Sequence, residues 1–317
     1  MKTMTIAVVG ATGSGKTALS IQMAKTIPNR LGDDVSFAEI ISCDAMQLYK
    51  GMDIGTAKIS PEEMENIPHH MLDCLEIEEE ASVAEYKEQT RKIIQDIQYK
   101  KGLPIIVGGS GLYLRAVIDK LEFPPTDILV RTKYENLATE KGNEFLYAML
   151  QEKDPLAASN IEEQNTRRII RALEVIELSG KPFSSTLPTY EYEIPTLQIG
   201  VRMPNELLDE RLYQRCEVMF ESGLVQETEK LLAKGLRQAK TASKATGYAQ
   251  TIAYLDGEIT LKEAIEQTFI ATRQLSRRQI KWFRRDKRIQ WFDISQMSKE
   301  DIVEETIKLY EACKMSK

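Results

Sequence analysis

The sequence has few cysteines and no long apolar run. Its four cysteines, Cys43, Cys74, Cys216 and Cys313, are scattered and form no C-x-x-C pair. This arrangement argues against a zinc ribbon or a disulfide framework, and it favours a reducing compartment. No apolar segment approaches the roughly 20 residues that a membrane-spanning helix needs, and the first residues lack the pattern of a signal peptide. We therefore expect a cytoplasmic protein that contacts no membrane.

Positive charge is not in excess either, because the formal net charge is −6 at pH 7. This value excludes a globally basic nucleic-acid-binding protein, although a local basic surface remains compatible with it. The 42% apolar and 28% charged residues match ordinary soluble composition. A chain of 317 residues corresponds to about two domains. His69 and His70 are the only histidines, and without a third ligand at metal-site spacing we interpret them as structural.

Short apolar runs alternate with helical patterns in the first part of the chain. This alternation predicts a parallel sheet of α/β type. The expected strands lie at residues 5–9, 38–42, 71–75 and 104–107, the expected helices at 16–26 and 82–100, and an expected loop at 28–36.

The pattern changes near Pro124. From about residue 127 to 182 only helical signals occur, of which residues 165–179 give the clearest. Strand patterns return at 196–201 and 289–292. We predict an α/β core formed by residues 1–119 and 196–317, which a helical insertion at 120–195 interrupts.

One motif has the spacing G-x-x-x-x-G-K-[ST]. It lies between an expected strand and an expected helix, the context in which such a loop binds phosphates through its backbone N–H groups. Lys16 would contact the terminal phosphates and Thr17 would ligate Mg²⁺. The motif alone does not distinguish ATP, GTP and a prenyl diphosphate. The expected diphosphate-binding residues are Gly10, Ala11, Thr12, Gly13, Ser14, Gly15, Lys16 and Thr17.

Two further polar residues follow expected strands. Asp44 comes after the second strand, and Ser110 comes after the strand at 104–107. The carboxyl ends of parallel strands line the ligand crevice, so Asp44 is a candidate to take a proton from a nucleophile. It is equally compatible with a helix N-cap. Ser110 either donates to a bound base or phosphate or caps a turn.

Basic residues cluster twice. Arg167, Arg168 and Arg171 stand at one helix start, either as phosphate contacts or as a solvated face. Between residues 273 and 288, helical spacing predicts one basic stripe, formed by Arg273, Arg277, Lys281, Arg284 and Arg288 with Arg278 beside it. Trp282 and Phe283 are interleaved. This excess favours an anionic partner, either a diphosphate or an RNA backbone; a basic helix offset by nearby acids is the alternative.

Taken together and in this order, the motifs resemble the tRNA dimethylallyltransferases, also called tRNA isopentenyltransferases, over roughly residues 5–292. The stretch Asp44–Lys58 is far more specific than the phosphate loop. The resemblance implies a P-loop NTPase-like core with a helical insertion. Ala11 and Gly13 replace the usual Pro and Ala, Ala45 replaces a common Ser, and Ser110 replaces Thr. The eukaryotic zinc finger is absent, which implies a bacterial-type enzyme.

The same resemblance implies the reaction. Dimethylallyl diphosphate would bind the phosphate loop with Mg²⁺, and Lys16 and Thr17 would stabilise the leaving diphosphate. The acceptor would be N6 of the adenosine 3′ of the anticodon, in tRNAs that read U-initial codons, and Asp44 would take its proton. The insertion would clasp the anticodon stem of the tRNA, and we expect a monomer. The residues implied in tRNA binding are Asp44, Ala45, Met46, Gln47, Ser110, Arg131, Gln164, Asn165, Thr166, Arg167 and Arg168, while Arg273, Arg277, Arg278 and Lys281 are expected to contact an anion.

Three other functions compete with this one. An adenylate isopentenyltransferase uses the same donor but should not need a basic RNA-binding insertion. A P-loop small-molecule kinase would fit the loop and Asp44, and its lid arginines could correspond to Arg167, Arg168 and Arg171. An RNA-binding regulator with a degenerate loop is disfavoured, because Lys16 and Thr17 are both retained.

Overall fold

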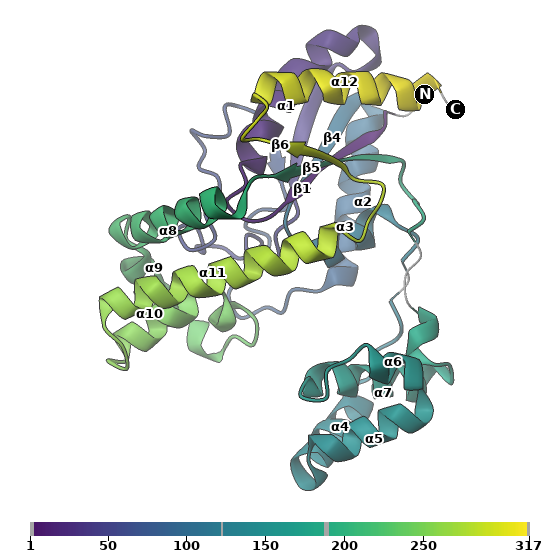
Figure 1. Cartoon of the computed structure of the whole chain (residues 1–317), viewed down its shortest axis with the longest axis vertical. Helices are drawn as coiled ribbons and strands as arrows, with labels where there is room; N and C mark the ends of the chain where they lie inside the picture. The colour runs from purple at the N-terminus through teal and green to yellow at the C-terminus, as the bar shows by residue number, and fades with distance from the viewer. Residues whose placement is uncertain (1–2, 122, 187–189, 316–317) are drawn as a thin grey trace. The chain divides into compact units, whose positions relative to one another are not determined.

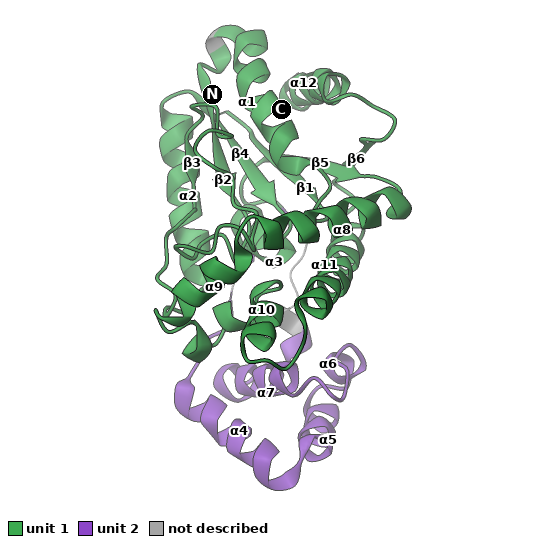
Figure 2. Cartoon of the chain, turned by 90° about the vertical axis from the view of Figure 1, so that its left-hand side faces the viewer, with its two compact units in different colours: residues 1–118, 192–317 green, residues 119–191 purple. Residues whose placement is uncertain are grey.

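The chain forms two compact units (Figure 2). The computed structural model describes residues 3–121, 123–186 and 190–315. The core unit comprises Met1–Ile118 and Tyr192–Lys317, and the insertion unit comprises Asp119–Glu191. The second boundary thus falls at 191, not at 195, because the amides of Glu193 and Ile194 both donate to the Ile118 carbonyl of the core unit.

A six-stranded sheet lies at the centre of the core unit (Figure 1), and all its strand pairs are parallel, which confirms the α/β prediction. The order of the strands is β3-β2-β4-β1-β5-β6. Their bounds are β1 (Thr5–Gly10), β2 (Phe37–Ser42), β3 (His69–His70), β4 (Gly102–Gly108), β5 (Thr196–Arg202) and β6 (Gln290–Asp293). β1 is central, so the phosphate loop that follows it emerges in the middle of the carboxyl edge.

The predicted third strand at 71–75 is wrong. The strand is the short β3, and Leu75 contributes only an isolated bridge to Tyr49. Met71 and Asp73 have φ values of +59° and +52°, which no strand accommodates. His69 and His70 therefore lie in the sheet edge, where His70 Nε2 contacts Glu39 Oε2 at 2.6 Å.

Helices cover both faces of the sheet, as alternating β1 side chains require. Ile6 and Val8 pack with α1 (Lys16–Leu31) and α12 (Lys299–Met315). Ala7 and Val9 pack with α2 (Val83–Tyr99) and α3 (Gly111–Ile118). The remaining helices of this unit are α8 (Asn205–Glu221), α9 (Leu224–Leu232), α10 (Tyr248–Leu255) and α11 (Leu261–Phe283).

The first helix is longer than predicted, so the loop expected from residue 28 is partly wrong. α1 continues through Pro28 to Leu31 and ends where Gly32 adopts a φ of +60°. Pro28 lies in the last turns, where the missing N–H removes one hydrogen bond, and its ring is buried in the core. The prediction for α2 is confirmed, including Ser82 as the N-cap that accepts from the Glu85 amide.

The elements of the insertion unit are helices in the part that the structure describes, as predicted. Its helices are α4 (Ile128–Lys141), α5 (Asn143–Lys153), α6 (Pro155–Ser159) and α7 (Thr166–Ser179), with a short 3₁₀ turn at Phe183–Thr186. A core that includes Tyr134, Leu146 and Leu173 joins them. Asn165 caps α7, and Gly180 ends it in the left-handed conformation.

No helix within residues 3–121, 123–186 and 190–315 is both long enough and apolar enough to span a bilayer.

Candidate active site

The phosphate loop wraps around the carboxyl end of β1. Gly10 has a φ of +152°, and a Cβ there would lie 2.4 Å from the Val201 carbonyl oxygen, so only glycine fits. Gly13 and Gly15 have φ values of +77° and +82°. Lys16 opens α1, and its Nζ donates to the Ala11 carbonyl at 2.5 Å. The ammonium is therefore turned into the loop, where an anionic ligand would replace the carbonyl as its partner.

Arg215 of α8 supplies a second cation to this loop. Its Nη1 donates to the Thr12 hydroxyl at 3.2 Å. Its Nε is buried and has no hydrogen-bond partner among the described residues. A buried guanidinium donor without a partner costs free energy, so this atom indicates where an anion would bind.

The electrostatics of the loop fit anion binding. Burial lowers the pKa of Lys16 to about 8; the nearby Asp44 carboxylate opposes this shift and the Arg215 guanidinium adds to it. Burial also lowers the pKa of Arg215, against the effect of Asp44. The negative charge of a bound diphosphate would offset the electrostatic repulsion between Lys16 and Arg215.

Asp44 lies two residues after the end of β2 and is half-buried. Its Oδ1 accepts a hydrogen bond from the Met46 amide at 2.9 Å. The Ser110 hydroxyl accepts from the Ala45 amide at 3.3 Å, so the turn after β4 fixes the backbone beside Asp44. The structure thus brings Asp44, Ser110 and Lys16 to one edge of the sheet, as the sequence predicted from strand ends.

Helix α11 covers the loop. The Thr12 amide donates to Gln279 Oε1 at 2.8 Å. The same side chain packs on Gly109, where a Cβ would lie 2.3 Å from Gln279 Nε2. One glutamine therefore links the phosphate loop to the turn that holds Ser110.

The loop that runs from Asp44 to Lys58 is anchored by hydrogen bonds at residues 53–55. The Glu227 carboxylate accepts from the amides of Asp53, Ile54 and Gly55 at 2.9 to 3.3 Å, and from the Tyr248 hydroxyl at 2.5 Å. Four donors on one carboxylate make a strong anchor.

Gln47 connects that anchored end to β2. Its Oε1 accepts from the Ser42 hydroxyl at 2.8 Å, and its Nε2 donates to the carbonyls of Thr56 and Ala57 at 3.3 Å each. Lys58 closes the loop with ion pairs to Asp53 and Asp73, both at 2.6 Å. Hydrogen bonds and ion pairs within the chain therefore fix the loop that follows Asp44.

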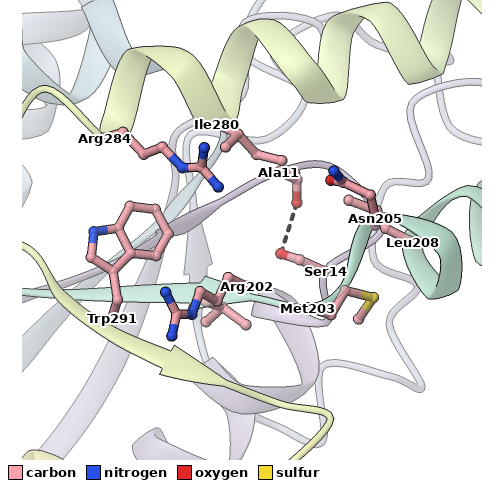
Figure 3. Close-up of a pocket in the computed structure, with 10 residues that line it drawn as sticks. Ala11, Ser14, Arg202, Met203, Asn205, Leu208, Ile280, Arg284 and Trp291 are labelled. Carbon is pink, nitrogen blue, oxygen red and sulfur yellow. Dashed lines mark hydrogen bonds between the residues drawn. The ribbon is translucent and has the colours of Figure 1, made fainter.

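A cavity of about 120 Å³ adjoins the phosphate loop on the β5–β6 side (Figure 3). Asp44 follows β2, on the other side of β1. Ala11 and Ser14 of the loop line the cavity together with Arg202 and Arg284, and Figure 3 shows the Arg284 guanidinium turned toward it. The only ion pair of Arg202 in the described chain is a long one, 3.9 Å to Asp293. The cavity thus extends the positive environment of the loop.

In the insertion unit, the predicted RNA-binding arginines differ in their surroundings. Arg131 donates to the buried Glu174 carboxylate at 3.2 Å, and Arg171 donates to the same group at 2.8 Å. Arg167 and Arg168 are exposed at the start of α7, without an ion pair in the described part of the chain. Gln164, Asn165 and Thr166 lie at the same helix start. The RNA roles of these residues stay a prediction.

The insertion is not basic as a whole, which corrects one expectation. Between residues 119 and 191 acidic side chains outnumber basic ones. Arg167 and Arg168 are the adjacent pair of exposed arginines in it. Overall charge therefore does not separate an RNA-modifying enzyme from an adenylate-modifying one.

The predicted basic stripe is wrong at its last residue. α11 ends at Phe283, so Arg288 does not lie on the helix; its Nη2 donates to Asp286 at 2.7 Å. Arg277 pairs with Asp209 at 2.7 Å, and the Arg273 guanidinium lies 5.4 Å from the Phe269 ring centroid. Of the expected anion contacts, Arg277 is therefore paired within the protein, whereas Arg278 and Lys281 are exposed and have no ion pair in the described chain.

The loop fits a magnesium ion that is bound together with a diphosphate. Thr17 is exposed at the start of α1, and in the described chain its hydroxyl has no hydrogen bond. No cluster of three or more His, Cys, Asp or Glu side chains among these residues could hold a metal by itself. Mg²⁺ ordinarily combines few protein ligands with phosphate oxygens and water, which matches this arrangement.

A parallel sheet with a phosphate loop after its central strand β1, and a carboxylate after β2 at the same edge of the sheet, defines an α/β enzyme of the P-loop class. Within that class the chain belongs to the IPP transferase family, whose model matches residues 47–286. It is 49% identical to a tRNA dimethylallyltransferase of Thermobifida fusca, over 90% of this chain and 88% of that protein. It is 47% identical to one of Kineococcus radiotolerans, over 90% and 89%.

Solved structures agree with this assignment. A tRNA isopentenylpyrophosphate transferase from Bacillus halodurans superposes with a TM-score of 0.71 at 35% identity, over 98% of this chain and 96% of that one. A eukaryotic dimethylallyltransferase described as acting on tRNA gives a TM-score of 0.77 at 28% identity, over 92% and 74%.

Sequence reasoning missed Arg215, Gln279 and Glu227. Arg215 had a signal, because it interrupts the otherwise apolar face of α8 formed by Leu208, Leu212 and Cys216. Gln279 and Glu227 had none, since their partners are backbone amides more than a hundred residues away.

Proposed function

We propose that this protein transfers a dimethylallyl group from dimethylallyl diphosphate to N6 of the adenosine 3′ of the anticodon, in tRNAs that read U-initial codons. The observation that carries the proposal is the meeting of Lys16, Arg215 and Asp44 at one edge of the sheet, an anion site beside a carboxylate. Relatives named tRNA dimethylallyltransferase, which match over nine-tenths of the chain, support it.

In the proposed reaction, the diphosphate lies against the backbone of Gly10–Thr17. Lys16 and the unpartnered Nε of Arg215 stabilise the charge that develops when the C1–O bond breaks. A magnesium ion held by Thr17 would neutralise part of that charge.

The adenosine amine is the nucleophile. Its nitrogen forms the new bond to C1 of the dimethylallyl group while diphosphate leaves with the bonding electrons. The amine is weak because its lone pair is delocalised into the ring, and Asp44 takes the proton that it loses. The target base must leave its stack to reach this edge of the sheet.

The residues around Asp44 are proposed to hold the RNA. Ala45, Met46 and Gln47 follow it in an anchored loop, and Ser110 fixes that loop from β4. In the insertion unit, Arg167 and Arg168 offer uncompensated charge for the phosphates of the anticodon stem.

The proposal is tested by following labelled dimethylallyl from its diphosphate, with Mg²⁺, into unmodified tRNA or into AMP. Label in tRNA alone is the expected result. Label in AMP would make this an adenylate isopentenyltransferase. Hydrolysis of ATP without any prenyl transfer would identify a P-loop kinase instead.

A further inference from the structure

The carboxylate of Glu227 binds three consecutive backbone amides of a loop that is distant in sequence. Glu227 lies on α9, and its two oxygens together accept from the amides of Asp53, Ile54 and Gly55 at 2.9 to 3.3 Å. These amides have no other acceptor in the described chain. A buried backbone N–H group that loses its partner costs free energy, so the conformation of residues 53–55 depends on this one side chain.

A further donor fixes the carboxylate itself. The Tyr248 hydroxyl, at the start of α10, donates to Glu227 Oε1 at 2.5 Å. The Tyr248 ring is completely buried and fills the space over Gly55, where a Cβ would lie 2.4 Å from Cε2 of the ring. Tyr49 and Met52 of the loop belong to the same apolar core as Tyr248. Glu227 thus joins the loop to α9 and α10 in a well-packed part of the core unit.

A chain of hydrogen bonds leads from Ile54 to the two sides of Asp44. The Ala57 amide donates to the Ile54 carbonyl at 3.0 Å. The Ala57 carbonyl accepts from Gln47 Nε2 at 3.3 Å, and Gln47 Oε1 accepts from the Ser42 hydroxyl at 2.8 Å. Asp44 stands between Ser42 and Gln47 in the sequence. A shift of Ile54 would therefore move Gln47 and, with it, the segment that carries Asp44.

The phosphate loop is held by other contacts. Thr12 is bonded through its amide to Gln279 of α11 and through its hydroxyl to Arg215 of α8. In the part of the chain that the structure describes, all hydrogen bonds of the Glu227 side chain go to residues 53–55 and Tyr248. The support from Glu227 therefore acts on the side of Asp44 and not on the diphosphate site.

We propose that Glu227 is a positioning residue for the acceptor nucleotide. Its carboxylate fixes the loop so that Asp44 meets the adenosine amine in the geometry that proton transfer needs, while Glu227 itself contacts neither substrate. The inference rests on the proposed function and adds to it a group that acts through the loop. Reaction rates depend steeply on such geometry, because a misplacement of about 1 Å can lower a rate by about 10²-fold.

The first test separates the acceptor from the donor. Glu227→Gln keeps the shape of the side chain, but its NH₂ group cannot accept from the amides of residues 53–55. The single-turnover rate at saturating tRNA should fall about 10- to 100-fold, while the affinities for inorganic diphosphate and for dimethylallyl diphosphate stay at the wild-type values. Glu229→Gln, an exposed residue on the same helix, is the matched control and should leave all three quantities unchanged.

Two outcomes of this test would overturn the proposal. One is a wild-type rate in Glu227→Gln. The other is a loss of donor affinity as large as the loss of rate, because a general structural role predicts that both decline together. Should Glu227→Gln fail to fold, Tyr248→Phe removes one donor and leaves the three amides bonded. It should show the same pattern with a smaller loss of rate, and equal losses for donor and acceptor would again overturn the proposal.

The second test follows the loop directly by hydrogen exchange and mass spectrometry. In Glu227→Gln the peptide that contains residues 53–55 should exchange faster than in the wild type, whereas the peptide that contains residues 13–17 should keep its wild-type rate. Unchanged exchange at residues 53–55 would show that the carboxylate does not hold the loop. Faster exchange throughout the chain would show a general loss of stability and would contradict the positioning role.

Failure of this inference is distinguishable from failure of the proposed function. If wild-type protein modifies tRNA and Glu227→Gln modifies it at the wild-type rate, only the role of Glu227 is wrongly assigned. If wild-type protein transfers no prenyl group to tRNA, the proposed function itself fails.

Discussion

The Ala45 amide donates to the Ser110 hydroxyl at 3.3 Å, so the residue after Asp44 is held by the turn after β4. Because β2 and β4 are adjacent in the sheet, this hydrogen bond joins two neighbouring strand ends. Ser110 thus has a positioning role toward Asp44, whatever its contact with RNA. Serine and threonine both supply the hydroxyl that this bond requires.

Asp44→Asn should lower kcat by about 10²- to 10⁴-fold, the range for loss of a general base, while tRNA binding stays nearly intact. The amide keeps the shape of the side chain but cannot take a proton. Single-turnover transfer measures the first quantity, and filter binding measures the second. Asp96→Asn, on the exposed surface of α2, is the control. Unchanged turnover in Asp44→Asn would remove Asp44 from the mechanism.

The affinity for diphosphate should fall about tenfold between pH 7 and pH 9. Lys16 has a pKa lowered to about 8, so its ammonium is present below that pH and lost above it, and only the charged form attracts the anion. Lys16→Arg, whose charge persists over this range, should give a flatter profile. Isothermal titration of inorganic diphosphate measures both proteins. Profiles with the same slope would show that another group titrates.

Tyr248→Phe should lower the free energy of unfolding by about 1–3 kcal/mol, because it removes one of the donors to the Glu227 carboxylate. The buried ring keeps its packing against Gly55, so the change isolates the hydroxyl. Urea denaturation is the measurement. Tyr213→Phe, with an exposed ring on α8, serves as control and should shift stability by less than about 0.5 kcal/mol. Equal effects in both variants would argue against the Glu227 anchor.

Arg167→Ala combined with Arg168→Ala should weaken tRNA binding and reduce the salt slope by about 1.5, as for two lost phosphate contacts. Both side chains are exposed and lack ion pairs in the described chain. Lys153→Ala, an exposed cation of α5 in the same unit, tests whether any loss of positive charge has this effect. An unaltered slope in the double variant would return the pair to an ordinary solvated helix face.

Periodicity and strand-end logic were sufficient for most of the sheet and for the placement of Asp44. The buried run Ile6–Val9 contains no polar residue, so its sequence pattern indicates a buried strand without ambiguity. Asp44 could be placed because parallel strands carry their functional residues at one edge of the sheet. β3 was not predicted because a strand of two residues is too short to show an alternation of apolar and polar side chains. Its position is set by pairing with Ile40 and Ile41 of β2.

The sequence did not show which charged residues are paired within the protein and which are free to bind a ligand. Arg277 and Arg278 are neighbours in sequence, yet the first pairs with Asp209 of α8 and the second is exposed. Arg131 and Arg171 converge on Glu174, which is completely buried. Such pairings depend on which side of a helix faces another element, and only the folded chain decides that.

The most direct test of the central claim is the identity of the nucleoside that the protein makes. Unmodified tRNA that reads U-initial codons, treated with the protein, dimethylallyl diphosphate and Mg²⁺, is digested to nucleosides and examined by mass spectrometry. We expect N6-dimethylallyladenosine that derives from the single position 3′ of the anticodon. Absence of this nucleoside, or its appearance at another position, would refute the proposed function.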